Sequence, residues 1–232
     1  QAQEDLCYRL LMEQLVTAIS THFINLRASQ IDREIYWALK ALGEFVRVDR
    51  CFVDLYSDDL TGISQTYEWC AEGVRPRSDR MKEMSFESFS CSMEQKQLFD
   101  YIHIPGESEC SSCKKVKKEV WIACDMKSLF AIPLVMKKTL VGLFGFSSDR
   151  VEKIWKEEDI KLLKMVGEFF VNLFDRKKND EELWKSRNML QVVLDSIPAR
   201  IFWTNSTFYY LGCKRLFDSD NCRKSPEEIT GN

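Results

Sequence analysis

The residues of this sequence best suited to chemistry are two cysteines in a CxxC spacing, Cys110 and Cys113. Lysines follow them at positions 114, 115, 117 and 118. Nearby cations lower the pKa of a thiol, and the thiolate is the form that reacts with oxidants. The pair is therefore a redox candidate, although a lone CxxC also occurs without any special role, and that plainer interpretation is favoured.

A metal site is a further interpretation of the same two cysteines. A structural zinc ion takes four ligands, and the nearby residues able to complete the set are His103, Cys91 and Cys124. The sequence contains no second CxxC. The spacing therefore does not favour metal binding.

Several aromatic residues are candidates to line an apolar pocket for a small planar ligand. They are Tyr67, Trp69, Phe86, Phe89, Trp121 and Phe130. Aromatic residues in this number more often simply build a core. The sequence leaves both interpretations open and does not identify a ligand.

Hydrophobic periodicity predicts the elements that position these residues. Apolar residues at helical spacing predict a helix over 31–46 and another over 5–27, with the stripe Leu6, Leu10, Leu11, Leu15, Ile19 and Phe23. The middle of the chain is predicted to form strands at 50–57, 64–71, 99–104, 128–135 and 139–148, and a helix at 109–122. Gly142 and Gly145 predict the close approach of another backbone or of a ligand. Hairpin-paired strands with helices at both ends predict an antiparallel sheet with helices on one face.

Residues 155–197 are predicted to form one long helix around which the rest of the chain is organised. Alternate steps of four and three residues meet a seam in one heptad phase: Leu162, Val166, Phe169, Leu173, Arg176, Asp180, Leu183, Arg187, Leu190, Leu194 and Ile197. Arg176 and Asp180 are placed to pair with each other. A sustained 3.5-residue repeat keeps facing a partner helix. We therefore expect a connector that forms a homodimer through residues 155–197, rather than an ordinary terminal helix.

Composition limits the class of protein. The chain of 232 residues has room for one full domain, a connector and a fragment. The net charge of −3 shows that the chain does not have the excess of basic residues typical of a nucleic-acid-binding protein. Nine irregularly spaced cysteines favour reduced thiols over a disulfide framework. Without a bilayer-spanning run or a signal peptide, we expect a soluble, cytoplasmic segment with no membrane insertion.

Five stretches together resemble the GAF domain of bacterial and archaeal signalling proteins. They are residues 67–74, 102–105, 128–135, 140–146 and 155–159. The resemblance implies an α+β fold with a six-stranded antiparallel sheet, helices on one face and a ligand pocket on the other. The GAF sensory domain would then occupy residues 1–176, and the long connector helix would occupy residues 155–197.

Residues 187–232 are similar to the start of a PAS domain. The likeness rests on residues 190–198, 201–203, 210–217 and 225–231. Lys214 stands where such sequences usually carry Asn. A GAF domain followed by a helical connector and a PAS domain resembles the sensory half of a histidine kinase or of a cyclic-di-GMP enzyme. The sequence contains neither a Gly-rich phosphate loop nor a phospho-acceptor histidine motif.

The GAF resemblance adds two interpretations of the candidate residues. Some GAF sensors bind haem or bilin through His or Cys, which makes His103, Cys91 and Cys124 candidates, although a structural role is favoured for His103. Residues 122–125 are also similar to the catalytic-cysteine segment of free methionine-(R)-sulfoxide reductases. Cys124 would then be the nucleophile and Cys91 the resolving thiol. However, the Gly-Val-Cys-Gly loop of those enzymes is absent around Cys91, and Trp121 stands where they carry His.

We therefore expect a non-enzymatic sensory module that binds a small ligand or senses redox state. It would relay this state through a dimeric helix to an output domain such as a histidine kinase. The ligand-pocket candidates are Tyr67, Trp69, Cys91, His103, Trp121, Cys124 and Phe130, and the redox candidates are Cys110 and Cys113. No catalytic residue or metal ligand is assigned. The alternatives are a sulfoxide reductase that uses Cys124 and a purely structural dimerisation module.

Overall fold

The computed structural model describes residues 2–24, 26–57, 59, 62–77, 100–105, 127–150, 153–197, 202–207 and 210–213. The chain divides into two units, Gln1–Lys177 and Lys178–Asn232. The helix that the sequence predicts at 109–122 lies outside the described residues.

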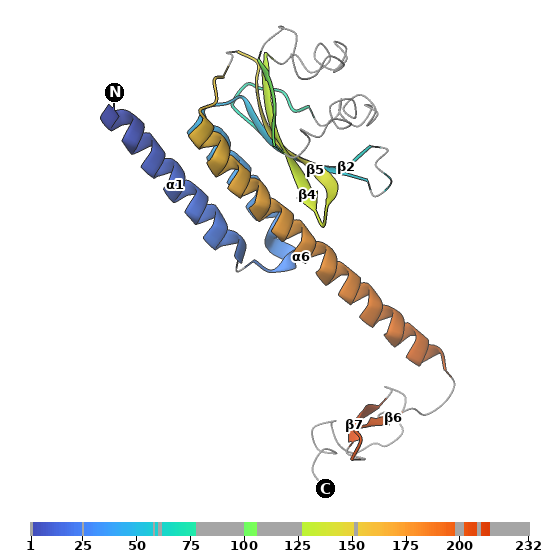
Figure 1. Ribbon diagram of the computed structural model, residues 1–232. Coiled ribbons are helices and arrows are strands. Elements are labelled where there is room, and N and C mark those ends of the chain that lie inside the picture. The colour runs from blue at the N-terminus through green and yellow to red at the C-terminus, as the bar shows by residue number, and fades with distance from the viewer. Residues whose placement is uncertain are drawn as a thin grey trace. The chain divides into compact units, whose positions relative to one another are not determined.

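The first unit combines a five-stranded sheet with helices (Figure 1). Its elements in chain order are α1 Ala2–Ile24, η1 Ala28–Gln30, α2 Ile31–Val46, β1 Arg50–Tyr56, β2 Ile63–Cys70, β3 Ile102–Pro105, β4 Ser128–Met136, β5 Thr139–Ser148 and α6 Glu157–Ser196. The strands lie in the order β2-β1-β5-β4-β3, and every neighbouring pair is antiparallel. The predicted α+β fold is thus confirmed, and the described residues contain five of the six expected strands.

Two residues with left-handed backbone close the β4–β5 hairpin. Lys137 and Lys138 have φ angles of 51° and 71°, as a two-residue type I′ turn requires. These two lysines therefore form the tight connection between β4 and β5. In β5, a Cβ atom added to Gly142 would lie 2.2 Å from the backbone oxygen of Asp54. The close approach predicted for this glycine is therefore that of another backbone.

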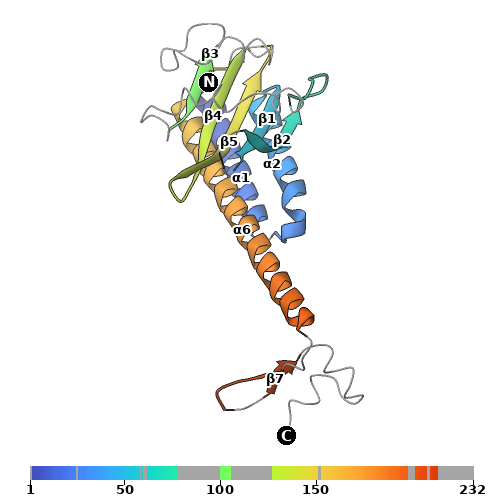
Figure 2. The ribbon, with the colours of Figure 1, turned by 90° about the vertical axis from the view of Figure 1, so that its right-hand side faces the viewer.

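Helices α1, α2 and α6 lie on one side of the sheet (Figures 1 and 2). Helices α1 and α6 run parallel to each other. Near the start of both, Lys156 Nζ donates to Asp5 Oδ1 at 2.7 Å, and near the end of α1, Arg176 reaches the backbone oxygen of Phe23. The aromatic rings of Phe144 and Phe170 pack between sheet and helix, with centroids 5.1 Å apart. The core therefore lies between the sheet and the helical layer.

The buried side of α1 differs from the predicted stripe. Its core residues are Met12, Val16, Ile19 and Phe23. Three leucines of the predicted stripe are about half exposed: Leu6, Leu10 and Leu11. Steps of three and four residues fit both sets, because periodicity identifies a helix but not which of two apolar faces meets the sheet.

Helix α6 begins two residues later than predicted and buries part of the predicted seam. Val166 is fully buried and Leu173 is 3% exposed within the core of the first unit. Leu162 and Phe169, which belong to the same seam, are only partly buried. The prediction that Val166 and Leu173 face a partner helix is therefore wrong, because both side chains are already buried in the core of the first unit.

The second unit contains two short strands. β6 (Phe202–Thr204) pairs with β7 (Tyr210–Cys213) in an antiparallel arrangement. Both fall in stretches that carry the similarity to a PAS domain, and that assignment stays a prediction. No helix within the described ranges is both long enough and apolar enough to cross a bilayer.

Candidate functional site

The face of the sheet opposite the helices carries buried charges. Alternate residues of a strand point to opposite faces. Cys51 and Val53 of β1 belong to the helix-covered core, so their neighbours lie on the other side. We call this group the polar face: Arg50, Phe52, Asp54, Glu68 and Arg77. Its four charged side chains are at most 5% exposed.

Glu68 of β2 is the centre of this network. The backbone N–H of Arg77 donates to Glu68 Oε2 at 2.8 Å, and Arg77 Nε donates to Oε1 at 2.9 Å. Arg50 Nε lies 4.0 Å from the same Oε1. Arg50 also donates to the backbone oxygen of Arg75 at 3.0 Å and forms an ion pair with Asp149. These charge-assisted contacts fix the segment that follows β2 against the sheet.

Asp54 and Arg77 approach each other without closing a hydrogen bond. Arg77 Nη2 lies 3.8 Å from Asp54 Oδ2. The Arg77 guanidinium stacks over the Phe52 ring, with its central carbon 3.7 Å from the ring centroid. Burial raises the pKa of Asp54, while the nearby charge of Arg77 and a hydrogen bond from Thr66 oppose that rise. Among the residues that the structure describes, Asp54 Oδ1 and Arg77 Nη2 are buried atoms without a hydrogen bond.

The two cysteines described within the sheet are poor redox candidates. Burial raises the pKa of Cys51 well above its ordinary value and that of Cys70 to about 11. Little thiolate exists at neutral pH in either case, so both thiols are unreactive. The predicted redox pair Cys110 and Cys113 lies outside the described residues. So do five predicted pocket residues: Phe86, Phe89, Cys91, Trp121 and Cys124.

The other predicted pocket residues lie on the helix-covered face. They are Tyr67, Trp69, His103 and Phe130. Phe130 stacks on Trp155 with centroids 4.5 Å apart, and His103 meets the edge of Phe130 at 6.4 Å. Tyr67 meets Tyr36 of α2 edge-on at 5.7 Å, and Trp69 fills the space beside Gly43. This packing accounts for a core role, and ligand binding by these residues stays a prediction.

Sequence reasoning did not select Asp54 or Arg77. For Asp54 a signal existed, because a carboxylate interrupts the otherwise apolar run of a strand in Cys51–Tyr56. A charge at that position needs a buried partner. Arg77 gave no signal, since it lies in a stretch without periodicity.

Two basic residues hold α6 where the first unit ends. Lys177 Nζ and Tyr67 Oη both donate to Asp32 Oδ1 at 2.7 Å. Arg176 donates to the backbone oxygens of Ile24 at 3.0 Å and Phe23 at 3.1 Å. Arg176 therefore satisfies free carbonyl groups at the end of α1. It does not form the predicted ion pair with Asp180 in the described part of the chain. We call these contacts the helix junction.

Comparison with known families assigns the first unit. The family model described as GAF domain matches residues 31–172, which is more than half of the chain. The chain belongs to the GAF domain family. The match over residues 31–172 is sufficient for this family assignment.

One curated relative has a named function. The chain is 21% identical over 174 residues to the methanogenesis regulatory histidine kinase FilI of Methanothrix harundinacea. The match covers 73% of this chain and 19% of that protein. The chain therefore spans about a fifth of the length of this relative.

Solved structures share the GAF fold. The phycoerythrobilin-bound GAF domain of a cyanobacterial phytochrome has a TM-score of 0.54 and 13% identity, covering 73% of this chain and 96% of that one. The GAF domain of a protein named as a sensor histidine kinase from Pseudomonas syringae pv. tomato has a TM-score of 0.53 and 13% identity. That match covers 79% of this chain and 99% of the other. At these identities the likeness shows the fold alone.

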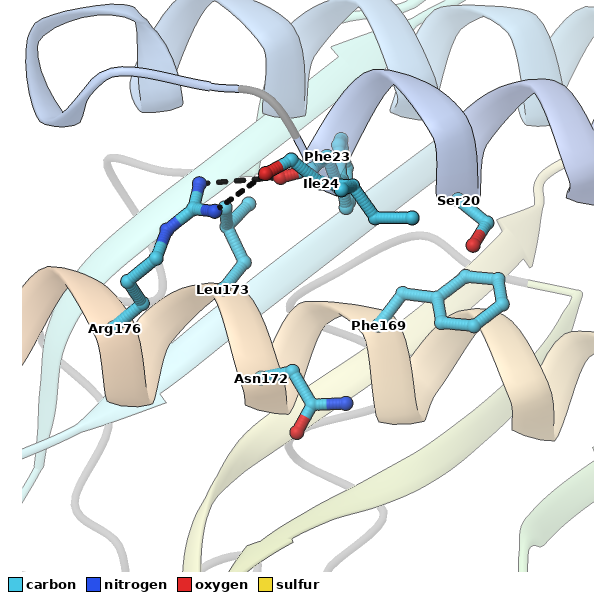
Figure 3. Close-up of a pocket in the computed structure, with 7 residues that line it drawn as sticks. All are labelled: Ser20, Phe23, Ile24, Phe169, Asn172, Leu173 and Arg176. Carbon is cyan, nitrogen blue, oxygen red and sulfur yellow. Dashed lines mark hydrogen bonds between the residues drawn. The ribbon is translucent and has the colours of Figure 1, made fainter.

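A groove of about 440 Å³ runs along the GAF domain between α1 and α6 (Figure 3). It is lined by Ser20, Phe23, Ile24, Phe169, Asn172, Leu173 and Arg176. Figure 3 shows Arg176 directed at the end of α1, while Phe169 and Asn172 extend from α6 farther along the groove. The outward side of α6 within the GAF domain is therefore partly apolar and open.

Proposed function

We propose that this chain is a sensory module that passes a signal from its GAF domain through α6, paired with a second copy, to an output domain such as a histidine kinase. The signal would be the binding of a small ligand or a change in redox state. The GAF family and the named function of the relative support this proposal. Within it, the segment is regulatory rather than enzymatic, and its cytoplasmic location stays a prediction.

The observation that supports the proposal most is that α6 has a first part buried in the GAF core and a second part that is exposed. Up to Phe174 the helix buries residues in the GAF core, and from Lys178 to Gln191 every residue is exposed. The exposed part carries apolar residues at helical spacing: Leu183, Leu190 and Val193. An apolar seam without cover on a helix of 40 residues suits a partner helix of the same kind.

The seam is continuous with the outward side of the GAF domain. Because Val166 and Leu173 are buried, the positions available beside Leu162 and Phe169 are Met165, which is 46% exposed, and Asn172. Leu162 and Phe169 keep the heptad phase of Leu183 and Leu190, while Met165 and Asn172 keep the phase of Val193. We therefore infer a contact surface of seven positions on α6, four of which, Leu162, Phe169, Leu183 and Leu190, belong to the predicted seam.

The helix junction offers a route from the sheet to α6. Tyr67 lies on β2 next to Glu68 of the polar face, and its hydroxyl shares Asp32 with Lys177. A shift of β2 would therefore alter the contacts that hold the end of the GAF part of α6. A ligand drives such a change only if it binds the two arrangements with different affinities.

Sedimentation of matched variants tests the paired helix. Leu190 and Val192 are equally exposed, at 61% and 60%, but point to opposite sides of α6. We expect the chain to be dimeric at micromolar concentration, Leu190→Glu to be monomeric and Val192→Glu to stay dimeric. A monomeric parent chain, or equal effects of both variants, would contradict the proposal.

Two alternatives remain as predictions from the sequence. A methionine-(R)-sulfoxide reductase would turn over free substrate, and Cys124→Ser would abolish this turnover. A purely structural module would dimerise and show no ligand-dependent stabilisation. An absorption spectrum after addition of haem, with His103→Ala as the comparison, tests the haem interpretation. No described contact favours these alternatives over the sensor.

A further inference from the structure

Helix α1 carries apolar residues on more than one side. The side that includes Met12 and Ile19 is fully buried in the core. Away from that side, Leu6 is 58% exposed, Leu10 is 51% exposed and Ile24 is 68% exposed. A helix that is apolar on more than one side is normally covered on more than one side. Within the part of the chain that the structure describes, this second side of α1 therefore lacks a cover.

The exposed residues lie on the side of α1 that borders the groove between α1 and α6. Ile24 lines the groove. Leu6 precedes Ile24 by five full helical turns, so both side chains project in the same direction. Leu10 lies within about 40° of that direction, whereas Leu11 lies about 140° away from it. The groove is therefore continuous with a line of exposed apolar residues on α1.

Helices α1 and α6 stay level with each other along the groove. Near their starts, Lys156 contacts Asp5, which is 151 positions earlier in the sequence. Near the end of α1, Arg176 contacts Phe23, which is 153 positions earlier. From α6, Phe169 reaches into the hollow of about 440 Å³ (Figure 3). The two helices therefore form one outward surface with an apolar groove along it.

The size of the contact surface on α6 indicates what covers this groove. That surface has seven positions, whereas a stable protein–protein interface usually involves about 20–30 residues on each side. Phe169 and Asn172 belong to those seven positions and also line the groove. The groove and the exposed side of α1 are thus directly continuous with the contact surface on α6. A second copy of the chain is the occupant that this continuity favours.

We propose that the groove and the exposed side of α1 bind the corresponding helices of a second copy, so that each copy contributes α1 as well as α6 to the dimer. In a two-fold symmetric dimer, the same surface of both copies takes part in the contact. Phe23, Ile24 and Phe169 line the groove and supply apolar packing, and Leu6 and Leu10 extend it along α1. This inference rests on the proposed function as a paired-helix sensor and adds a second helix to its contact.

Two neighbouring leucines provide a matched test. Leu10 and Leu11 are almost equally exposed, at 51% and 49%, but only Leu10 lies on the groove side of α1. Sedimentation of the whole chain measures the dissociation constant of the dimer. We expect Leu10→Glu and Leu6→Glu each to raise this constant by about tenfold or more, because the contact would bury a carboxylate without a partner. We expect Leu11→Glu to leave it unchanged.

Far-UV circular dichroism and urea titration of the same variants check that they fold. Leu6, Leu10 and Leu11 are all exposed within a single copy, so we expect the three variants to keep the helical content of the parent chain. If Leu10→Glu loses helical content, Leu10→Gln takes its place. Glutamine forms helices well, and this substitution still removes the apolar contact.

The outcomes separate this inference from the proposed function. A dimer that is weakened by Leu190→Glu but not by Leu6→Glu or Leu10→Glu overturns this inference alone, and the exposed side of α1 would then bind a different partner. A dimer that is weakened by Leu10→Glu but not by Leu190→Glu overturns the pairing of the exposed part of α6 alone. Equal weakening by Leu10→Glu and Leu11→Glu also overturns this inference. A chain that is monomeric at micromolar concentration overturns both.

Discussion

The two faces of the GAF sheet are both buried, but with opposite chemistry. The helix-covered face packs aromatic rings, such as Phe130, Phe144 and Phe170, against α1 and α6. The polar face instead buries four charged side chains. Apolar burial stabilises in proportion to area and tolerates variation. Buried charges demand fixed partners, so we assign stability mainly to the helix-covered face.

The largest effect should come from truncating the helix-covered face. Phe170 is fully buried and meets Phe144 at 5.1 Å and Phe23 at 5.5 Å. We expect Phe170→Ala to lower the free energy of unfolding by about 3–5 kcal/mol, measured by urea titration. Glu168→Ala on the same helix, at an exposed site outside the proposed contact surface, should cost less than about 1 kcal/mol. Similar losses in both would contradict the assignment.

The next effect should come from breaking the polar face at its centre. Glu68→Ala leaves two buried guanidinium groups, Arg50 and Arg77, without their shared carboxylate. We expect a loss of about 3 kcal/mol in the free energy of unfolding. Glu72→Ala, at an exposed site four residues along, is the control and should be nearly neutral. A negligible effect of Glu68→Ala would mean that the network does not hold the sheet.

A smaller change in the free energy of unfolding should come from Asp49, and it should depend on pH. Burial would raise the pKa of Asp49, but hydrogen bonds from Ser148 Oγ and from the backbone N–H groups of Asp149 and Arg150 hold it below its ordinary value. This stability is present above the ordinary pKa of about 3.9 and is lost as the pH falls through the lowered pKa. Asp49→Ala should cost about 1–3 kcal/mol at pH 7.

Unfolding titrations of Asp49→Ala and the parent chain should therefore converge as the pH is lowered below about 4. Because other lowered carboxylates, such as Asp32, are common to both chains, the difference isolates Asp49. A difference that stays constant from pH 7 to low pH would contradict the role given to its charge.

The smallest effect should come from removing the hydroxyl group of Tyr67, which connects β2 to the helix junction. Tyr67→Phe removes the hydrogen bond to Asp32 and those that the hydroxyl accepts from Gln65 Nε2 and Lys177 Nζ, but leaves the contact between Lys177 and Asp32. We expect a loss of about 1 kcal/mol in the free energy of unfolding. Tyr36→Phe, at a residue that is 47% exposed, is the matched control. A loss as large as that of Phe170→Ala would show that the junction is a main support of the fold.

The sequence predicted the helices and strands better than it predicted which side of each one is buried. Strand alternation and helical periodicity identified β1, β5 and α6, because these patterns are local. Which leucines of α1 meet the sheet depends on packing between distant segments, so Leu6 and Leu10 were placed in the wrong layer. The same limit applies to Val166, whose seam position suited a partner helix and the sheet equally well.

The candidate site was harder to predict than the fold. Tyr67 and Phe130 were selected for their aromatic character, which the core uses as readily as a pocket does. Asp54 and Arg77 lie 23 positions apart in the sequence, and only the pairing of β1 with β2 and the turn of the chain after β2 bring them together. No local sequence pattern indicates that Asp54 and Arg77 lie close together.

The strand order also has a consequence for how the chain is made. β1 pairs first with β2, which follows it directly in the chain. Residues 50–55 of β1 can pair with residues 142–147 of β5 only after β5 has been synthesised. Closing so long a loop carries a large entropic cost, and an uncovered strand edge invites pairing with other chains. During synthesis, Cys51 and Val53 therefore remain open until β5 and then α6 have left the ribosome. A ribosome stalled before β5 would hold a nascent chain that is prone to aggregate, and one stalled after α6 would hold a folded domain.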